Sequence, residues 1–312
     1  MYKSSNLITK LIALFALCLT AVAAQAQSAQ VFVSATQGVD SGACALANPC
    51  RNVNFALTQV QSGGQVHLID SGNYSQIIVN KSVKIAAAPG IAAVITHAVF
   101  DDAVITISVA GNVTLSGLWI DGQGVTKDGV RLSGGKVVIE NCVIEARESG
   151  IVLPNSASLY VVNSAFRYST RGIAATPADN INGINQELII ERCRFLNHGL
   201  AGLFITPDNG QSVRANLRQC LFQKGAAALQ LDGGGGGTIE VNLEESSLMG
   251  GSVGIATSNI GNAGSVVARV SECIIVANST GLSGNGTVLS RGNNTLEGNT
   301  TNGAFSGAYA AK

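Results

Sequence analysis

The stretch LIIERCRFLNHGLAGLFI, from Leu188 to Ile205, carries the pattern that decides the fold of this chain. A short apolar strand and a polar pair precede Cys193, and a large apolar residue, Phe195, follows two positions later. Gly202 then stands inside the next short apolar stretch. Because side chains in a strand alternate between its two faces, Cys193 and Phe195 are predicted to point to the same, inward side.

Seven copies of this pattern follow one another in steps of 22 to 29 residues. The small column reads Leu118, Cys142, Ser164, Cys193, Cys220, Ser246 and Cys273. The large column reads Ile120, Ile144, Phe166, Phe195, Phe222, Leu248 and Ile275. The downstream column reads Gly129, Gly150, Gly172, Gly202, Ala228, Gly254 and Gly281, and we interpret it as one bend of each copy. Val83 and Thr295 extend the small column at either end, which gives about nine copies.

Each copy has room for about three short strands and contains no helical pattern of ten residues. Helical repeats need two helices per copy and a propeller blade needs ~40 residues, so both architectures are excluded. One coil of a parallel β-helix fits the period, because each strand stacks on the same strand of the next coil. The sequence therefore predicts an all-β solenoid, a single-stranded parallel β-helix of about nine coils with a densely packed interior.

Four cysteines belong to the small column, and serine takes the same place in other copies. A buried thiol behaves as a small hydrophobe, so these cysteines are predicted to be packing residues. A catalytic thiol would need an adjacent histidine and an electropositive, partly exposed setting. Cys193 and Cys220 are the pair that occupies neighbouring coils, so they alone could be bridged.

Both ends of such a stack must be covered, because an open coil exposes apolar interior and unpaired strand edges. Cys44 and Cys50 are predicted to close a small disulfide loop near the first coil. The stripe of an amphipathic helix follows this loop, at Val53, Ala56, Leu57 and Val60. We expect this short capping α-helix to end at Gly63-Gly64, before a strand from Val66 to Ile69. The tail from Gly292 to Lys312 is predicted to form a polar last coil and cap.

The first residues have the features of an export signal. Lys3 and Lys10 accompany an apolar run from Leu11 to Val22, and Ala24-Gln25-Ala26 offers a cleavage site. The chain is therefore predicted to be secreted, to the periplasm or the cell exterior, after cleavage near Ala26. About twelve apolar residues cannot cross a ~30 Å hydrocarbon layer, and no later segment is longer, so no membrane span is expected. The predicted organisation is a signal peptide over 1–26, a strand, disulfide loop and capping helix over 27–65, and the β-helix with its cap over 66–312.

The composition agrees with a turn-rich, compact β protein. Hydrophobic residues make up 46% of the chain and charged residues only 12%, which excludes intrinsic disorder. The 19 basic and 19 acidic residues balance, so no nucleic acid partner is expected. The oligomeric state is left open.

Several stretches resemble a known family. They are VFVSATQGVDSGAC, PCRNVNFAL and GGQVHLIDSGNYSQIIVNKSVKI near the start, and SRGNNTLEGNTTNG near the end. In these the chain is similar to secreted bacterial right-handed β-helix proteins of the pectin-lyase-like group. The resemblance implies a right-handed coil over essentially all of the chain after the export signal. The group includes lyases, hydrolases, esterases and adhesins, so the resemblance implies a fold more closely than an activity.

The strand after the glycine column is expected to form the floor of a groove. Its outward positions, none of them a carboxylate, are Arg131, Val152, Ala174, Phe204, Gln230, Ala256 and Ser283. Asp179, Asp208 and Asp232 follow at the bends of successive coils and could line up to bind a calcium ion, together with Arg131, Phe204 and Gln230 at a glycan site. The alternative, which we favour, is that these aspartates only build turns. No other metal or cofactor is expected.

Basic residues gather after the large column. They are Arg147, Arg167, Arg171, Arg194, His198 and Lys224. Because they fall on adjacent coils, they could form a basic stripe that holds an acidic polysaccharide. A mixed, solvated face is the alternative, since Glu145, Glu148, Glu187 and Glu191 lie among them.

Two functional hypotheses follow. The first is a secreted β-helix without a complete catalytic set, which binds extracellular or cell-surface polysaccharide or acts as a structural or adhesive module. The alternative is a polysaccharide lyase or glycoside hydrolase that acts on glycans containing uronic acid, with or without calcium. The sequence favours the first, because paired carboxylates in a recognisable catalytic run do not occur in it.

Overall fold

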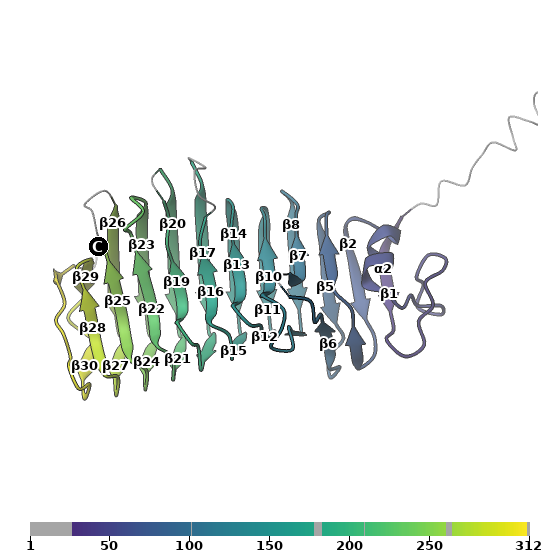
Figure 1. Cartoon of the computed structure of the whole chain (residues 1–312). Helices are drawn as coiled ribbons and strands as arrows, with labels where there is room; N and C mark the ends of the chain where they lie inside the picture. The colour runs from purple at the N-terminus through teal and green to yellow at the C-terminus, as the bar shows by residue number, and fades with distance from the viewer. Residues whose placement is uncertain (1–26, 101, 178–182, 209, 260–263, 311–312) are drawn as a thin grey trace, which may run out of the picture.

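Three parallel sheets run along the molecule, each with one strand from nearly every coil (Figure 1). The computed structural model describes residues 27–310 apart from 101, 178–182, 209 and 260–263. The predicted signal peptide therefore lies outside the described residues. The sheets stack strand on strand in one direction, which makes the chain a parallel β-helix, as predicted.

Sheet A has twelve described strands. They are β1 Ser28–Val33, β2 Val60–Leu68, β5 Val83–Ala87, β8 Asn112–Ser116, β11 Lys136–Glu140, β14 Ala157–Val162, β17 Asn185–Glu191, β20 Ser212–Arg218, β23 Thr238–Glu244, β26 Ser265–Ser271, β29 Thr287–Ser290 and β31 Gly307–Ala308. Sheet B has ten described strands. They are β3 Gly72–Tyr74, β6 Ala93–Thr96, β9 Leu118–Asp121, β12 Val143–Glu145, β15 Ala165–Arg167, β18 Arg194–Leu196, β21 Leu221–Gln223, β24 Ser247–Met249, β27 Ile274–Val276 and β30 Thr295–Glu297.

Sheet C has nine described strands, which agrees with the predicted number of coils. They are β4 Ile77–Val79, β7 Ala103–Ile107, β10 Asp128–Leu132, β13 Ser149–Leu153, β16 Arg171–Ala175, β19 Ala201–Ile205, β22 Ala227–Asp232, β25 Val253–Ser258 and β28 Thr280–Gly284. Each coil thus runs from sheet A through a sharp bend to sheet B, and through a second bend to sheet C.

The large column forms the centre of the core. The rings of Phe166, Phe195 and Phe222 stack in register, with centroids 4.9 and 4.5 Å apart and nearly parallel planes. All three are fully or almost fully buried. The predicted inward direction of this column is therefore confirmed.

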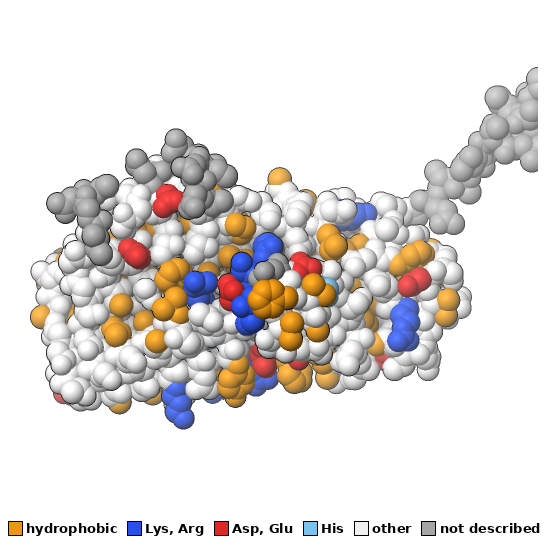
Figure 2. Space-filling model, viewed as in Figure 1, with side chains coloured by type: hydrophobic (Ala, Val, Ile, Leu, Met, Phe, Trp, Pro, Cys, Tyr) orange, Lys and Arg blue, Asp and Glu red, His pale blue; other side chains and the backbone are white. Residues whose placement is uncertain are grey.

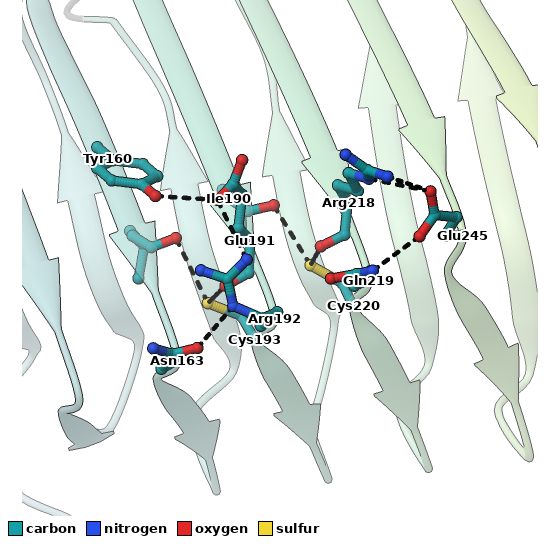
Figure 3. A network of polar contacts seen from close by, with 11 residues as sticks. Tyr160, Asn163, Ile190, Glu191, Arg192, Cys193, Arg218, Gln219, Cys220 and Glu245 are labelled. Carbon is teal, nitrogen blue, oxygen red and sulfur yellow. Dashed lines mark hydrogen bonds and ion pairs between the residues drawn. The ribbon is translucent and has the colours of Figure 1, made fainter.

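The small column is buried as predicted, and its four thiols are free. Cys193 donates to the backbone carbonyls of Glu191 and Val161, so it is not bridged to Cys220 (Figure 3). Serine replaces cysteine because its hydroxyl adds a bond between coils: Ser164 Oγ accepts the N–H of Cys142 at 3.1 Å. Burial raises the pKa of the Cys193 thiol to about 12, which keeps it protonated.

The predicted extension of this column by Val83 and Thr295 is wrong. Register continues the column from Leu118 to Ala93, whereas Val83 belongs to sheet A. At the other end Asn294 stands below Cys273 and accepts its N–H at 2.8 Å, while Thr295 pairs with Ile274. Both end coils keep the two-residue spacing, in Ala93 with Ile95 and in Asn294 with Leu296. Neither has a cysteine or serine at the small position, so the sequence alone misplaced the column there.

The glycine column is needed for space and does not supply bends. Gly150 lies within β13, and a Cβ there would stand 2.6 Å from the carbonyl oxygen of Gly172 and 2.9 Å from Cδ1 of Phe166. Left-handed backbone occurs instead at the bends on either side of sheet B. At the first bend it is adopted by Asn141, Asn163, Arg192, Gln219, Glu245 and Glu272, and at the second by Tyr168, Asn197, Lys224 and Ala277.

The N-terminal cap contains the predicted disulfide, Cys44–Cys50, and the helix α2, Val53–Gln59. Asn52 caps the helix through its side chain, which accepts the N–H of Asn54 at 2.7 Å. The helix ends four residues earlier than predicted, because Val60 turns extended and pairs with Ser28 of β1. Gly63 and Gly64 therefore lie inside β2.

Candidate functional site

The outward column of sheet C is the floor of the candidate site. Register places Arg131 beside Val152, and the column continues through Ala174, Phe204 and Gln230 as predicted. Among these five residues of the column, Arg131 alone is charged. Figure 2 shows basic, acidic and hydrophobic side chains gathered together near the middle of the molecule on this view. Between Arg131 and Gln230 the floor is therefore mostly apolar, with its charge at Arg131.

Arg131 is held by Asp128, the first residue of the same strand. Its Nε and Nη2 atoms lie 3.1 and 2.6 Å from Oδ2 of Asp128, whose side chain is only 3% exposed. Burial raises the pKa of Asp128 above its ordinary value, although the guanidinium of Arg131 acts in the opposite direction. The pair fixes Arg131 in place on sheet C.

A second carboxylate lies one coil away. The backbone N–H of Asp128 donates to the carbonyl of Asp102 at 3.1 Å. Burial raises the pKa of Asp102, but bonds from the N–H of Ala103, from Gln76 and from His97 outweigh it and lower the pKa below its ordinary value. The pKa values of Asp102 and Asp128, on neighbouring coils, are thus shifted in opposite directions.

Arg171 stands at the start of β16, in register with Ser149 of β13. Its guanidinium carbon lies 4.8 Å above the centre of the Phe204 ring. Its Nε is buried and has no hydrogen-bond partner within the described part of the chain. Among those same residues the Arg171 guanidinium makes no ion pair, so its charge is available to an anion.

Arg147 and Phe100 form another such pair at the bend before sheet C. The guanidinium carbon of Arg147 lies 4.2 Å from the ring centre of Phe100, which is 62% exposed. Arg147 also contacts Glu148 at 3.1 Å, and Glu148 lies 4.0 Å from Lys127. An aromatic ring orients the arginine that stacks on it. The guanidinium groups of these arginines are therefore held in position before a ligand binds.

Three members of the predicted basic stripe are therefore stacked on aromatic rings: Arg147, Arg167 and Arg171. Arg194 and Lys224 are exposed on later coils. His198 does not belong to this surface, because it is 4% exposed and its Nδ1 lies 3.2 Å from the carbonyl oxygen of Ser169. Burial lowers the pKa of His198 to about 4, so the ring is neutral at pH 7.

Of the three predicted aspartates, the structure describes Asp208 and Asp232. Asp232 accepts the N–H of Gly234 at 2.9 Å, inside its own turn. Asp208 is bridged through its backbone to Gly236, and its N–H donates to Gln211. Asp179 lies outside the described residues. Across the described ranges no three His, Cys, Asp or Glu side chains are grouped to hold a metal ion, so the calcium site stays a prediction.

Sequence reasoning missed Asp128, Asp102 and Phe100. Asp128 could have been noticed as an acid next to a groove strand that otherwise lacks carboxylates. Phe100 could not, because its partner Arg147 is 47 positions away and only the stacking of coils brings them together.

Comparisons with known proteins agree with the architecture. A family model described as "Right handed beta helix region" matches residues 93–248. A solved pectate lyase, Pel9A, aligns with a TM-score of 0.62 at 14% identity, covering 90% of this chain and 78% of its own. A rhamnogalacturonan lyase aligns with a TM-score of 0.48 at 11% identity, covering 78% of this chain and 74% of its own.

An alginate lyase from Paenibacillus aligns with a TM-score of 0.47 at 12% identity, covering 85% of this chain and 99% of its own. No curated protein matches the sequence. Within the described residues, none of the helices is both long and apolar enough to cross a membrane. The family model spans half of the chain, and the three-sheet coil extends on both sides of it, so the chain belongs to the right-handed β-helix family.

Proposed function

We propose that this chain is exported and binds an acidic polysaccharide along sheet C, without turning it over. The observation that carries the proposal is Arg171. Its guanidinium is stacked on Phe204, its Nε is buried without a partner within the described residues, and it makes no ion pair there. The side chain of Arg171 as a whole is partly exposed, so a ligand carboxylate could pair with its guanidinium.

The arrangement of the two arginines suits an extended polymer. Register places Arg171 of β16 two coils after Asp128 of β10, whose partner is Arg131. At ~4.8 Å per coil, the two positions are about 10 Å apart along the axis. Val152 and Ala174 lie between these two positions, and their small side chains project little above the sheet. An acidic chain lying along the axis could therefore contact both cations.

Binding is favoured over turnover because Arg131 is fixed by its two contacts with Asp128. An arginine keeps its proton in proteins, so Arg131 is a poor base. It is a good partner for a carboxylate or for a sugar hydroxyl.

One observation favours the alternative, a polysaccharide lyase or glycoside hydrolase. Asp102 and Asp128 come from neighbouring coils, and their pKa values are shifted in opposite directions. Such a difference is typical of acid and base pairs in glycan-cleaving sites. Under this alternative Asp128 would donate a proton and Asp102 would act as the base.

Calorimetric titration of the protein with polygalacturonate and with alginate measures the binding of each polymer and tests the proposal. We expect saturable binding that weakens with salt, and at least a tenfold loss of affinity in Arg171→Gln. Arg194→Gln is the matched control, because Arg194 is exposed on sheet B and its loss should leave the affinity unchanged. Absence of binding to both polymers would overturn the proposal.

The same samples decide between binding and turnover. They are assayed for unsaturated products and for new reducing ends, with and without calcium. Turnover that is abolished in Asp128→Asn would replace the binding proposal with the enzymatic one. Binding without product would remove the enzymatic alternative for these polymers.

A further inference from the structure

A group of exposed aromatic side chains lies on sheet B, away from the floor of sheet C. Trp119 on β9 is the only tryptophan of the chain and is 37% exposed. Tyr168 directly follows β15 and is 64% exposed. Both rings thus lie outside the core and leave part of their surface open to a ligand.

Arg167 joins the two rings. Its guanidinium carbon lies 5.6 Å from the ring centre of Trp119 and 6.0 Å from that of Tyr168. Its Nε lies 2.5 Å from Oε1 of Glu145, which fixes the guanidinium and neutralises it. The rings are thus oriented by one anchored side chain while part of each stays open to solvent.

The residue type at the bend of Tyr168 is unusual for its backbone. Tyr168 has a φ of +60°, in the left-handed region. The equivalent positions of other coils hold Asn197, Lys224, Gly250 and Ala277 with the same conformation, so the conformation itself belongs to the bend. A bulky aromatic residue is unfavourable there, and the ring of Tyr168, at 64% exposure, gains little burial in return. Neither the bend nor the core therefore accounts for a tyrosine at this position.

We propose that Trp119, Arg167 and Tyr168 form a binding platform for a neutral sugar chain. The apolar C–H face of a pyranose ring packs on an aromatic face, and its hydroxyls need polar partners beside it. Asp121 and Glu145 supply acceptors, since they stand in register on adjacent strands at the edge of the platform. Because Glu145 is paired with Arg167, the charge left beside the platform is that of Asp121, which would repel an acidic sugar. The platform therefore differs in specificity from the proposed site on sheet C.

The single tryptophan provides a direct readout. The emission of Trp119 is followed during titration with cellohexaose and chitohexaose, with polygalacturonate as the acidic comparison. We expect a saturable change with at least one neutral oligosaccharide and none with polygalacturonate. Arg171→Gln should not alter the response, which separates this platform from the function proposed for sheet C. Failure of either proposal can therefore be recognised without the other.

The variant Tyr168→Asn separates binding from stability. Asparagine tolerates left-handed backbone, so the free energy of unfolding should not fall, whereas affinity for the neutral sugar should fall at least tenfold. Ala277→Asn changes the equivalent bend of another coil and should leave the affinity unchanged. The proposal is overturned if Tyr168→Asn binds as tightly as the wild type, or if the Trp119 emission responds only to polygalacturonate. It is equally overturned if neither neutral sugar changes the emission. It is also overturned if the emission changes with protein concentration alone, because a second copy of the chain would then be covering these rings.

Discussion

At the scale of single residues, Asp70 fastens the N-terminal cap to the first coil. It accepts hydrogen bonds from the Ser34 hydroxyl, the Ala35 N–H and the Tyr74 hydroxyl, each at 2.7 Å, and further bonds from Thr36. We expect Asp70→Asn to lower the free energy of unfolding by about 3 kcal/mol, because the amide cannot accept all of these bonds. Urea unfolding measures this loss.

The same substitution should change the pH dependence of stability. Burial raises the pKa of Asp70, but bonds from Thr36, Ser34 and Tyr74 outweigh it and hold the pKa well below its ordinary value. A depressed carboxyl pKa stabilises the fold above pH 4, and this contribution is lost as the pH falls. The gap between wild type and Asp70→Asn should therefore be widest near pH 7 and close in acid. Asp232→Asn is the control, and a gap that stays constant down to pH 2 would contradict the argument.

The glycines beneath the phenylalanine column offer a second test at this scale. A Cβ at Gly172 would stand 2.5 Å from the carbonyl oxygen of Gly202 and 2.6 Å from Cδ1 of Phe195. We expect Gly172→Ala to cost about 3 kcal/mol, because both neighbours are fixed in the core. At Gly199 the nearest atom to such a Cβ is Thr170 Cα at 3.7 Å, so Gly199→Ala should change stability by less than about 1 kcal/mol. Equal losses in the two variants would show that crowding is not the cause.

At the scale of the elements, the bends around sheet B are set by backbone conformation. Ala277 has a φ of +57° and no side chain that could compensate for the cost. Ala277→Gly should therefore raise the free energy of unfolding by about 1 kcal/mol, as measured by thermal or urea unfolding. Ala226→Gly, at the bend two coils earlier and without left-handed backbone, should lower it by a similar amount. A loss in both variants would contradict the account of the bend.

The strands and their inward faces could be predicted because the spacing of Cys193 and Phe195 repeats with every coil. The left-handed bends could not, since Asn163, Arg192 and Gln219 share the conformation without sharing a chemistry. His198 misled the sequence interpretation for a related reason. It follows the large column as the arginines do, yet it turns inward to the carbonyl of Ser169.

The candidate sites depend on contacts between coils, which no local pattern reports. Phe204 could be placed on the groove floor from its strand alone. Its partner Arg171 could be assigned only to a stripe, because whether a long side chain leans over the next coil depends on its neighbours. The sequence therefore predicted where the outward positions lie, and the structure adds which of them meet.

At the scale of the whole molecule, each coil contacts mainly its two neighbours, so the ends need separate protection. Asn54 of α2 accepts the N–H of Ile78 and donates to the carbonyl of Gln76, which covers the edge of β4. Removal of residues 27–59 should expose that edge and the core beside Val60. We expect the truncated chain to aggregate in sedimentation experiments, whereas Asn54→Ala alone should remain soluble and be destabilised by about 2 kcal/mol. A soluble, fully folded truncated chain would contradict the capping role of the N-terminal segment.

The interior, by contrast, should tolerate the loss of one coil if the register is kept. Deleting residues 194–220 removes 27 residues and joins Cys193 to Leu221, so that Phe222 takes the place of Phe195 and can stack on Phe166. We expect a folded protein whose thermal unfolding, followed by circular dichroism, stays cooperative, because every remaining coil keeps two neighbours of the same shape. Deleting 194–219, one residue fewer, is the matched control. It places Phe222 three positions after Cys193, which turns the ring away from the core, and this chain should fail to fold. If both deletions fold equally well, the columns do not set the register of the helix.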